Sequence, residues 1–260
     1  MKKDRAFDCL TASSLQALLP DCDDVFVRVA EEMDSTNNEA KRMVLDGARG
    51  CWLIAAQRQS AGRGRLGRSF YSPDGSGVYF SILLPAPGGL PDAVSLTCAA
   101  AVAVMRAVRA LTQKQTVIKW VNDLFYEGRK VCGILCEAVT VGEKQAVIVG
   151  IGINLKSAEF PAELQSIAGT LGADDVSREA LIASVYQELS PFLKDPTNHS
   201  WLSDYRDYSM VLGRRVCWTR NGDIFEGIAE EIDENGALIV RNDCGETEQL
   251  CTGEITLRLS

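Results

Sequence analysis

The segment QRQSAGRGRLGRSF, residues 57–70, carries four arginines and no acidic residue in a chain whose formal net charge is −8. Its glycines let backbone amides approach a ligand closely, and arginine forks suit a phosphate or a carboxylate. The glycine spacing matches neither a Walker A loop nor a G-x-G-x-x-G turn. The segment therefore predicts an anion-binding loop, with a solvated or nucleic-acid-contacting loop as the alternative.

The rest of the composition favours a globular protein and excludes several classes of function. The chain has 260 residues, of which 46% are hydrophobic and 24% charged, a balance that excludes a disordered or fibrous chain. No run reaches the ~20 apolar residues of a membrane span, and the N-terminus lacks the apolar core of a secretory signal. We therefore expect a soluble, cytoplasmic protein that binds no membrane, and its acidic balance argues against DNA as a partner.

The nine cysteines and the single histidine narrow the chemistry further. The cysteines form no C-x-x-C pair and His199 completes no usual zinc set, so ordinary reduced core cysteines are expected. His199 lies in the polar segment KDPTNHSW with no nucleophile motif nearby, which argues against acyl-enzyme hydrolysis.

Periodicity and turn residues predict an α+β protein of two parts, residues 1–209 and 210–260. In the larger part, strands are expected over 25–33, 51–57, 77–84, 116–121, 124–126, 130–139 and 145–153. Helices are expected over 13–19, 36–46, 91–111, 178–193 and 201–209, the second opened by a capping box of Thr36 and Glu39. Residues 58–75 are expected to form a loop, named here the Gly–Arg loop.

Residues 210–260, the smaller part, have a different sequence pattern. Short β-prone runs over 215–219, 224–232, 237–241 and 248–250 alternate with turns at Asn221-Gly222, Asn235-Gly236 and Cys244-Gly245. Asn-Gly is the strongest short hairpin signal, because both central residues must accept a positive φ. This part therefore predicts a small β-barrel appended to the larger domain.

Three further clusters place polar residues at the ends of expected elements. The segment KWVND, residues 119–123, precedes Lys130, whose ammonium can be fixed on a strand between a carboxylate and a phosphate, while Asp123 offers an oxygen ligand for Mg²⁺. The segment DSTN, residues 34–37, brings hydroxyl and amide groups to a helix start, where they can recognise a small polar ring. The segment GIGIN, residues 150–154, leaves room for a ligand against a strand. Taken singly, these are also an ordinary strand end, a helix cap and a buried strand.

In identity and order, these segments resemble the biotin protein ligases: D-S-T-N, Q-x-A-G-R-G-R-x-G-R, K-W-x-N-D, R-K-x-x-G-I-L and G-I-G-I-N-L. The resemblance runs from Asp34 to Leu155, and residues 210–260 are similar to the small SH3-like domain of that family. It implies an α+β catalytic domain, a mixed β-sheet flanked by helices and similar to class II aminoacyl-tRNA synthetases. It also implies activation of biotin by ATP to biotinyl-5′-AMP. Biotin would then pass to a lysine of a biotin carboxyl carrier protein, of acetyl-CoA carboxylase or a related carboxylase.

The resemblance implies a role for each matching residue. Biotin would contact Ser35, Thr36, Asn37, Gln59, Gly62, Arg63, Gly64, Arg65, Leu66, Lys130 and Gly133. ATP or the adenylate would contact Phe70, Lys119, Asn122 and Asn154, with Asp123 on Mg²⁺. Arg63, Arg65 and Lys130 would be the catalytic residues, facing the carboxylate and phosphate charge.

Two positions depart from the family pattern. Val121 stands where the family usually has proline, and we expect it to hold the same extended backbone less rigidly. Phe70 stands where bacterial relatives often have tryptophan, and it is expected to stack on adenine over a smaller area.

The resemblance leaves three alternatives to weigh. One family branch adds an N-terminal DNA-binding domain, but only 24 residues precede the strand at Val25, so a monofunctional ligase is expected. A lipoate ligase shares the fold and the adenylate chemistry, and a nucleic-acid-binding protein could use the Gly–Arg loop; the intact G-R-G-R-x-G-R and S-T-N segments favour biotin. Exposed strand edges near the loop would allow a homodimer, and the oligomeric state stays open.

Overall fold

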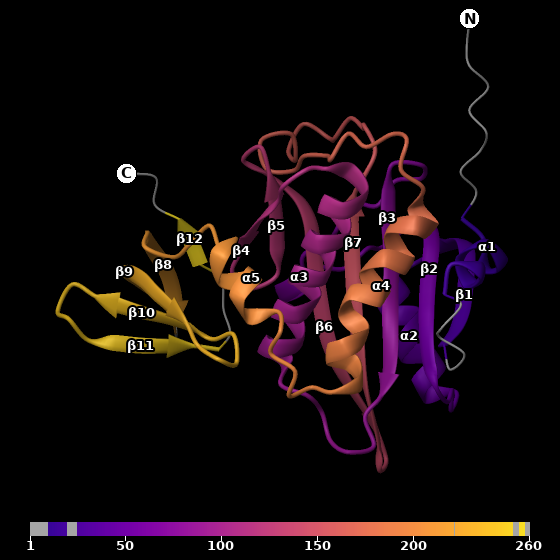
Figure 1. Cartoon of the computed structure of the whole chain (residues 1–260), viewed down its shortest axis with the longest axis horizontal. Coiled ribbons are helices and arrows are strands. Elements are labelled where there is room, and N and C mark those ends of the chain that lie inside the picture. Colours follow the sequence, from indigo (N-terminus) through magenta and orange to yellow (C-terminus); the bar gives the residue numbers. More distant parts are fainter. Residues whose placement is uncertain (1–9, 20–24, 221, 252–254, 258–260) are drawn as a thin grey trace, which may run out of the picture.

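The structure is a computed structural model that describes residues 10–19, 25–220, 222–251 and 255–257. The chain forms a large sheet covered by helices and a small sheet beside it (Figure 1). The large sheet has seven strands in the order β1-β2-β3-β7-β6-β5-β4, and the small one has five in the order β11-β10-β9-β8-β12. The predicted α+β class, a mixed sheet flanked by helices with a small β-rich part, is confirmed.

The elements of the larger part lie close to their predicted positions. Its strands are β1 (Val25–Met33), β2 (Cys51–Gln59), β3 (Gly77–Pro85), β4 (Val117–Lys119), β5 (Asp123–Tyr126), β6 (Arg129–Val141) and β7 (Lys144–Asn154). Its helices are α1 (Ala12–Ala17), α2 (Thr36–Leu45), α3 (Ala93–Thr112), α4 (Arg178–Lys194) and α5 (Leu202–Asp207), with a 3₁₀ turn η1 (Arg65–Gly67). Strands β1 and β2 run parallel and the other neighbouring pairs run antiparallel, which makes the sheet mixed.

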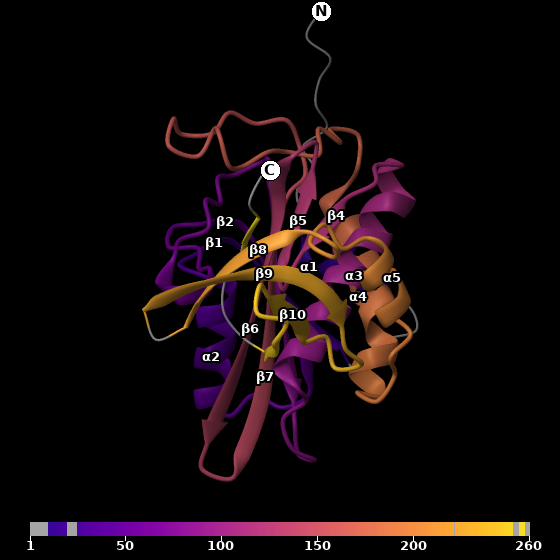
Figure 2. The ribbon, with the colours of Figure 1, turned by 90° about the vertical axis from the view of Figure 1, so that its left-hand side faces the viewer.

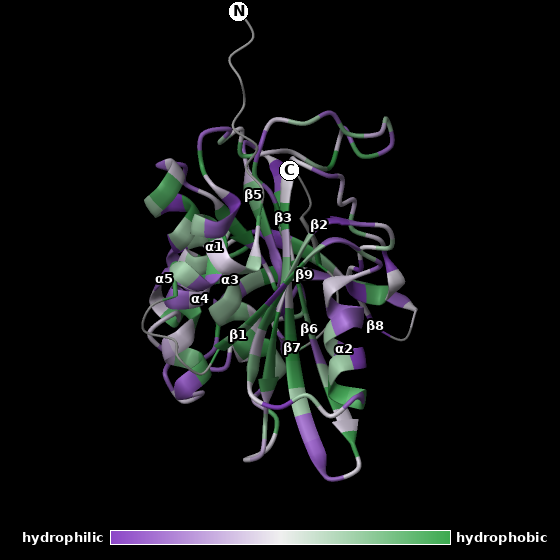
Figure 3. Cartoon of the chain, turned by 90° about the vertical axis from the view of Figure 1, so that its right-hand side faces the viewer, coloured by the Kyte–Doolittle hydropathy of each residue, from purple (hydrophilic) through white to green (hydrophobic). Residues whose placement is uncertain are grey.

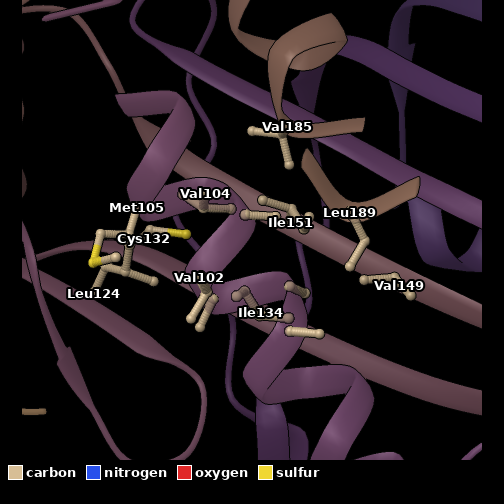
Figure 4. Packing of buried hydrophobic residues seen from close by; sticks show 14 of the residues in the cluster. Val102, Val104, Met105, Leu124, Cys132, Ile134, Val149, Ile151, Val185 and Leu189 are labelled. Atoms are coloured by element: carbon tan, nitrogen blue, oxygen red, sulfur yellow. The ribbon is translucent and has the colours of Figure 1, made fainter. Parts of the chain in front are cut away.

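The helices cover both faces of the large sheet. Helix α2 packs on one face and helices α3 and α4 on the other, as the view turned by 90° shows (Figure 2). The main core lies on the second face, where Val102 and Met105 of α3 and Leu189 of α4 meet Ile134 and Ile151 of the strands (Figure 4). Strands are hydrophobic where helices cover them, and the free end of the β6–β7 hairpin is hydrophilic (Figure 3).

Helix α3 is apolar enough, and long enough, to cross a membrane by those two measures alone. Of its most apolar window, however, 72% is buried inside the protein, so its hydrophobic side chains are used in the core. The helix begins after Asp92, whose carboxylate accepts a hydrogen bond from the Ser95 amide at 2.8 Å. Pro91, expected in the first turn, therefore lies just before the cap.

The start of α2 differs from the prediction. The helix begins at Thr36, as expected, but Ser35 is the N-cap and no side chain caps it. The Thr36 hydroxyl lies instead 3.3 Å from Gln59 Oε1 and 2.7 Å from Ser81 Oγ, while Glu39 forms salt bridges with arginines. The predicted capping box of Thr36 and Glu39 is therefore wrong, because partners from neighbouring strands and arginines take both side chains.

The small sheet contains β8 (Arg215–Arg220), β9 (Asp223–Ile232), β10 (Leu238–Asn242), β11 (Thr247–Leu250) and β12 (Ile255–Leu257). The first four strands match the predicted runs, and β12 was not predicted. Two of the predicted turns are confirmed, with Gly236 at φ +86° and Gly245 at φ +84°, whereas Asn221 lies outside the described residues. No ladder joins β11 to β12 among the described residues, so closure into a barrel stays a prediction.

The two parts of the chain share one hydrophobic core, which includes Val216 and Leu238 of the small sheet. The turn after β9 lies against the larger part: Ser95 Oγ donates to the Asn235 carbonyl at 2.9 Å, and Trp120 Nε1 donates to the Gly236 carbonyl at 2.9 Å. The small sheet is therefore tied to the segment that leads directly into residues 121–123. The boundary near residue 210 stays a prediction.

Candidate active site

A pocket opens beside the β6–β7 pair, between the start of α2, the Gly–Arg loop and the turn before β5. All the site residues predicted from the sequence line this pocket except Gly62, Leu66, Lys119 and Asn154. Segments that are more than 100 residues apart in sequence are thus brought together, from Ser35 to Gly152. The pocket also takes in Arg68 and Ser69 of the loop, and Ile134, Leu135 and Ile151 of the strands.

The pocket floor is a track of glycines on the two central strands. Gly133 of β6 pairs with Gly152 of β7, and Gly150 pairs with Leu135. A Cβ on Gly152 would lie 2.5 Å from the Phe70 ring, and a Cβ on Gly150 would overlap Asn37 Oδ1. These glycines therefore reserve the space above the sheet for the side chains of Phe70 and Asn37, whereas the GIGIN segment had predicted room for a ligand there.

One corner of the pocket carries uncharged polar groups, and we call Ser35, Thr36, Asn37 and Gln59 the polar corner. The first three side chains are almost fully buried, between 2% and 4% exposed. Gln59 Oε1 accepts a hydrogen bond from the Thr36 amide at 2.8 Å, and Gln59 Nε2 donates to Ser72 Oγ at 2.9 Å. The polar corner is therefore a preformed set of donors and acceptors, held in place by the ends of α2 and β2.

Two cations of the pocket are each held by a neighbour at the start of β5, Asn122 just before the strand and Asp123 as its first residue. Arg65 Nη1 donates to Asn122 Oδ1 at 2.9 Å, and Lys130 Nζ lies 2.6 Å from Asp123 Oδ1. Backbone hydrogen bonds of Lys130 to Ile167 and Gly169, both 2.9 Å, fix its strand from the other side. The ammonium is therefore positioned rather than free, as expected from its place in the sequence.

Arg63, the third cation, is held by Glu137, a residue that the sequence analysis did not single out. Arg63 Nη1 lies 3.1 Å from Glu137 Oε2 and 3.0 Å from Asn38 Oδ1. Burial acts to raise the pKa of Glu137, but hydrogen bonds and charge from Lys41, Asn37 and Arg63 outweigh it and hold that pKa below its usual value. Glu137 is therefore an ionised carboxylate at neutral pH.

The Gly–Arg loop folds back on itself like a small hairpin. Gly64 N donates to the Arg68 carbonyl at 2.7 Å, and Phe70 N donates to the Gly62 carbonyl at 2.9 Å. Leu66 stands at the tip with φ +53° and is 74% exposed. Leu66 and Gly62 do not line the pocket, so the predicted contact of these two residues with biotin has no support from their positions.

Two predicted nucleotide-binding residues are placed elsewhere. Asn154 is buried and its Nδ2 donates to the Gly169 carbonyl at 2.9 Å, so its amide is used within the protein. Lys119 lies on β4, with Nζ 6.0 Å from the centre of the Phe125 ring and outside the pocket lining. The predicted contact of these two side chains with ATP has no support from their positions.

The segment around Val121 also differs from the prediction. Strand β4 ends at Lys119, and Trp120 to Asn122 form a turn in place of the expected extended backbone. The Trp120–Val121 peptide bond is cis. Because Asn122 and Asp123 still line the pocket, the substitution of valine for proline leaves the site assembled.

Sequence reasoning missed two residues behind the polar corner, Ser81 and Glu137. Ser81 is fully buried on β3, and its Oγ lies 2.6 Å from Asn37 Oδ1. It is a single polar residue within the apolar run VYFSILL, and Glu137 directly follows the apolar run GILC. A lone polar residue inside a buried strand was the available signal, because such a group needs a hydrogen-bonding partner.

Comparison with known proteins places this sheet and pocket in a class. The sequence pattern of the biotin/lipoate A/B protein ligase family matches residues 29–154, and the pattern of the biotin protein ligase C terminal domain matches residues 211–258. The first of these defines the class: protein ligases that act with biotin or lipoate.

Individual relatives narrow the class. The chain is 32% identical to the bifunctional ligase/repressor BirA of Bacillus spizizenii, with 82% of this chain and 68% of that protein covered. It is 32% identical to the biotin–[acetyl-CoA-carboxylase] ligase of Paracoccus denitrificans, with 82% and 92% covered. The biotin protein ligase from Aquifex aeolicus, solved in complex with biotin and ATP, superposes with a TM-score of 0.77 at 30% identity, covering 90% of this chain and 99% of that one. The chain belongs to the biotin protein ligase family.

Proposed function

We propose that this pocket is where the chain, as a biotin protein ligase, activates biotin with ATP. The carboxylate of biotin attacks the α-phosphorus of ATP, which forms biotinyl-5′-AMP and releases pyrophosphate. A lysine amine of the carrier then attacks the anhydride carbonyl, which forms an amide and releases AMP and a proton. The observation that carries the proposal is the placement of the polar corner beside Arg63, Arg65 and Lys130 in one pocket.

The residue roles follow from the chemistry of the two substrates. The ureido ring of biotin carries N–H donors and a carbonyl acceptor, which the buried polar corner matches. The carboxylate and the triphosphate repel each other as they approach, and the guanidinium and ammonium groups of Arg63, Arg65 and Lys130 offset that repulsion. No histidine or acidic proton donor is required, because the attacking carboxylate is already ionised.

The nucleotide subsite is proposed for the region around Phe70 and Asn122. Phe70 lines the pocket above Gly133 and Gly152, and its ring can stack on adenine once the ligands enter. Asn154, which binds Gly169, is proposed to support that wall from behind rather than to touch ATP.

Magnesium is proposed to enter with ATP as its phosphate complex. Among the described residues, no group of three or more metal-binding side chains lies close enough to hold an ion without help. Asp123 supplies one carboxylate oxygen in the pocket, which fits an ion whose other ligands are phosphates and water. Asp123 is paired with Lys130 at 2.6 Å, so binding the ion requires that pair to loosen.

We further propose that the carrier is the biotin carboxyl carrier protein of acetyl-CoA carboxylase or a related carboxylase. The proposal is supported by the name of the relative from Paracoccus denitrificans, a biotin–[acetyl-CoA-carboxylase] ligase. The cytoplasm is the proposed location of this reaction. We also propose a homodimer paired through exposed strand edges near the Gly–Arg loop.

The test of this function is direct. The protein is incubated with biotin, ATP and Mg²⁺, and biotinyl-5′-AMP is sought by mass spectrometry. Lipoate in place of biotin is the matched control, because both acids suit adenylate chemistry. Formation of lipoyl-AMP with no biotinyl-AMP would contradict the assignment of biotin.

Gly150→Ala is expected to weaken biotin binding about tenfold or more, since a Cβ there would overlap Asn37 Oδ1 and displace the side chain from the polar corner. The measurement is the biotin Kd by calorimetry. Gly88→Ala is the matched control, because a Cβ on Gly88 meets nothing within 4 Å. Equal affinity in both variants would show that Asn37 need not occupy this position.

The Gly–Arg loop is expected to become ordered when ligand binds. Fixing each residue costs roughly 1–2 kcal/mol of backbone entropy, and the carboxylate and phosphates of the ligands offer the loop arginines further anionic partners. Amide hydrogen exchange over residues 62–68 should therefore slow on adding biotin and ATP. The exposed turn at Gly142 and Glu143 serves as the internal reference. Equal exchange in the loop with and without ligand would contradict the expectation.

A further inference from the structure

One carboxylate behind the pocket touches both of its functional regions. Glu137 lies on β6, and its side chain is only 18% exposed. Its Oε2 accepts a hydrogen bond from Asn37 Nδ2 at 2.9 Å, and its Oε1 accepts one from Lys41 Nζ at 2.7 Å. Arg63 Nη2 lies 3.1 Å from the same Oε1. Glu137 therefore joins the polar corner to the Gly–Arg loop.

The carboxylate decides which way the Asn37 carboxamide points. An ionised carboxylate only accepts hydrogen bonds, as does the Leu135 carbonyl, which lies 3.2 Å from Asn37 Nδ2. The amide nitrogen must therefore face Glu137 and Leu135. Asn37 Oδ1 consequently faces Ser81, whose hydroxyl lies 2.6 Å away and donates to it.

This direction continues to Thr36. The Ser81 hydroxyl lies between two oxygens, Asn37 Oδ1 and Thr36 Oγ1, and the second is 2.7 Å from Ser81 Oγ. Ser81 has one hydroxyl proton, so it can donate to only one of them at a time. Asn37 Oδ1 has no proton of its own, whereas Thr36 can turn its own proton toward Ser81 or toward Gln59 Oε1. With the Ser81 proton on Asn37, Thr36 uses its proton inside the protein and presents a lone pair to the ligand. Reversing the Asn37 amide would instead turn the Ser81 proton toward Thr36 Oγ1, which takes up that lone pair and leaves the Thr36 proton for Gln59 Oε1 or the ligand.

We propose that Glu137 is a positioning residue that fixes the direction of the hydrogen bonds offered by the polar corner and, through Arg63, anchors the Gly–Arg loop to that corner. The inference rests on the proposed function, since the ligand it concerns is biotin. The ureido ring has both N–H donors and a carbonyl acceptor, so a corner with a fixed hydrogen-bond direction selects it over rings with a different pattern.

Glu137→Gln tests the proposal, because it keeps the shape of the side chain and places a donor nitrogen where one carboxylate oxygen stood. Biotin Kd, measured by calorimetry without ATP, is expected to rise about 10–100-fold, the range for a hydrogen bond to a charged group. The affinity for ATP alone should change less than about threefold, within context-dependent variation. The thermal midpoint reports folding.

The second readout is discrimination between biotin and 2-iminobiotin, in which a C=NH group replaces the ureido carbonyl. The ratio of the 2-iminobiotin Kd to the biotin Kd, measured at fixed pH, should fall severalfold in Glu137→Gln. Discrimination is lost because the Asn37 amide is free to reverse. A role in stability alone would weaken both ligands equally and leave the ratio unchanged. Glu248→Gln is the matched control: Glu248 is also a strand residue paired with an arginine, Arg220, at 2.9 Å, and it lies in the small sheet.

Ser81→Ala keeps the test decisive if Glu137→Gln does not fold. It removes the hydroxyl that passes the hydrogen-bond direction to Thr36 and leaves the charged cluster intact. It should raise the biotin Kd and lower the same ratio. Unchanged Kd and ratio in the folded variants, with biotin bound normally by the unaltered protein, overturn this inference alone. Failure of the unaltered protein to bind biotin overturns the proposed function and this inference together.

Discussion

Lys130→Ala is expected to lower the rate of biotinyl-5′-AMP formation about 10²–10³-fold, the usual cost of removing an electrostatic group aimed at a developing charge. Lys130 is held on β6 by backbone hydrogen bonds to Ile167 and Gly169, and its ammonium is 2.6 Å from Asp123. In the proposed mechanism it is thus fixed where the carboxylate and the α-phosphate meet. The loss should appear in kcat for adenylation, measured by pyrophosphate release.

The control for this variant is Lys144→Ala, on the exposed end of the β6–β7 hairpin. It removes the same charge from the neighbouring strand at a distance from the pocket, and its adenylation rate should match that of the unaltered protein. Lys130→Arg separates charge from geometry, because the planar guanidinium cannot replace a compact ammonium. Near-normal adenylation by a folded Lys130→Ala protein would contradict the proposed catalytic role of Lys130.

Gly236→Val is expected to destabilise the protein by about 2–4 kcal/mol, because a branched residue is strained at positive φ and its Cβ would crowd the α3 helix. Gly236 has φ +86°, and a Cβ there would lie 2.7 Å from Cys98 Sγ. The turn also accepts the Trp120 indole hydrogen bond, which supports the segment leading to Asn122. We therefore expect kcat/KM for carrier biotinylation to fall about tenfold or more, since docking of the small sheet positions that segment.

Gly245→Val separates the two contributions to this effect. Gly245 has nearly the same φ, +84°, in another turn of the same sheet, and a Cβ there meets nothing within 4 Å. It carries the backbone strain without the contact to the larger part. Thermal melting and carrier kinetics that were equal in both variants would show that docking of the Gly236 turn has no part in the reaction.

The sequence by itself determined the elements and most of the site. Alternating apolar runs predicted the strands, including β1 at its observed bounds of Val25–Met33, because a strand buried on one face must alternate its side chains. The sequence also predicted the Gly–Arg loop, the polar corner and Lys130 as site residues. Their residue types alone indicate what they can bind: arginine and lysine bind anions, and hydroxyl and amide groups form hydrogen bonds. Local signals of this kind need no knowledge of what lies across the fold.

Only the tertiary structure decided how side chains share their partners. Thr36 satisfies the spacing of a capping box, yet it is the first residue of the helix and not its N-cap, and its hydroxyl bonds across to Gln59 and Ser81 of strands β2 and β3. Asn154 looked free for a nucleotide until the Gly169 carbonyl proved to be its partner. Glu137 stood out in the sequence only as a polar residue after an apolar run, because its importance comes from Asn37 and Arg63, which are distant in sequence. Hydrogen bonds and ion pairs depend on distance in space, and a sequence records only distance along the chain.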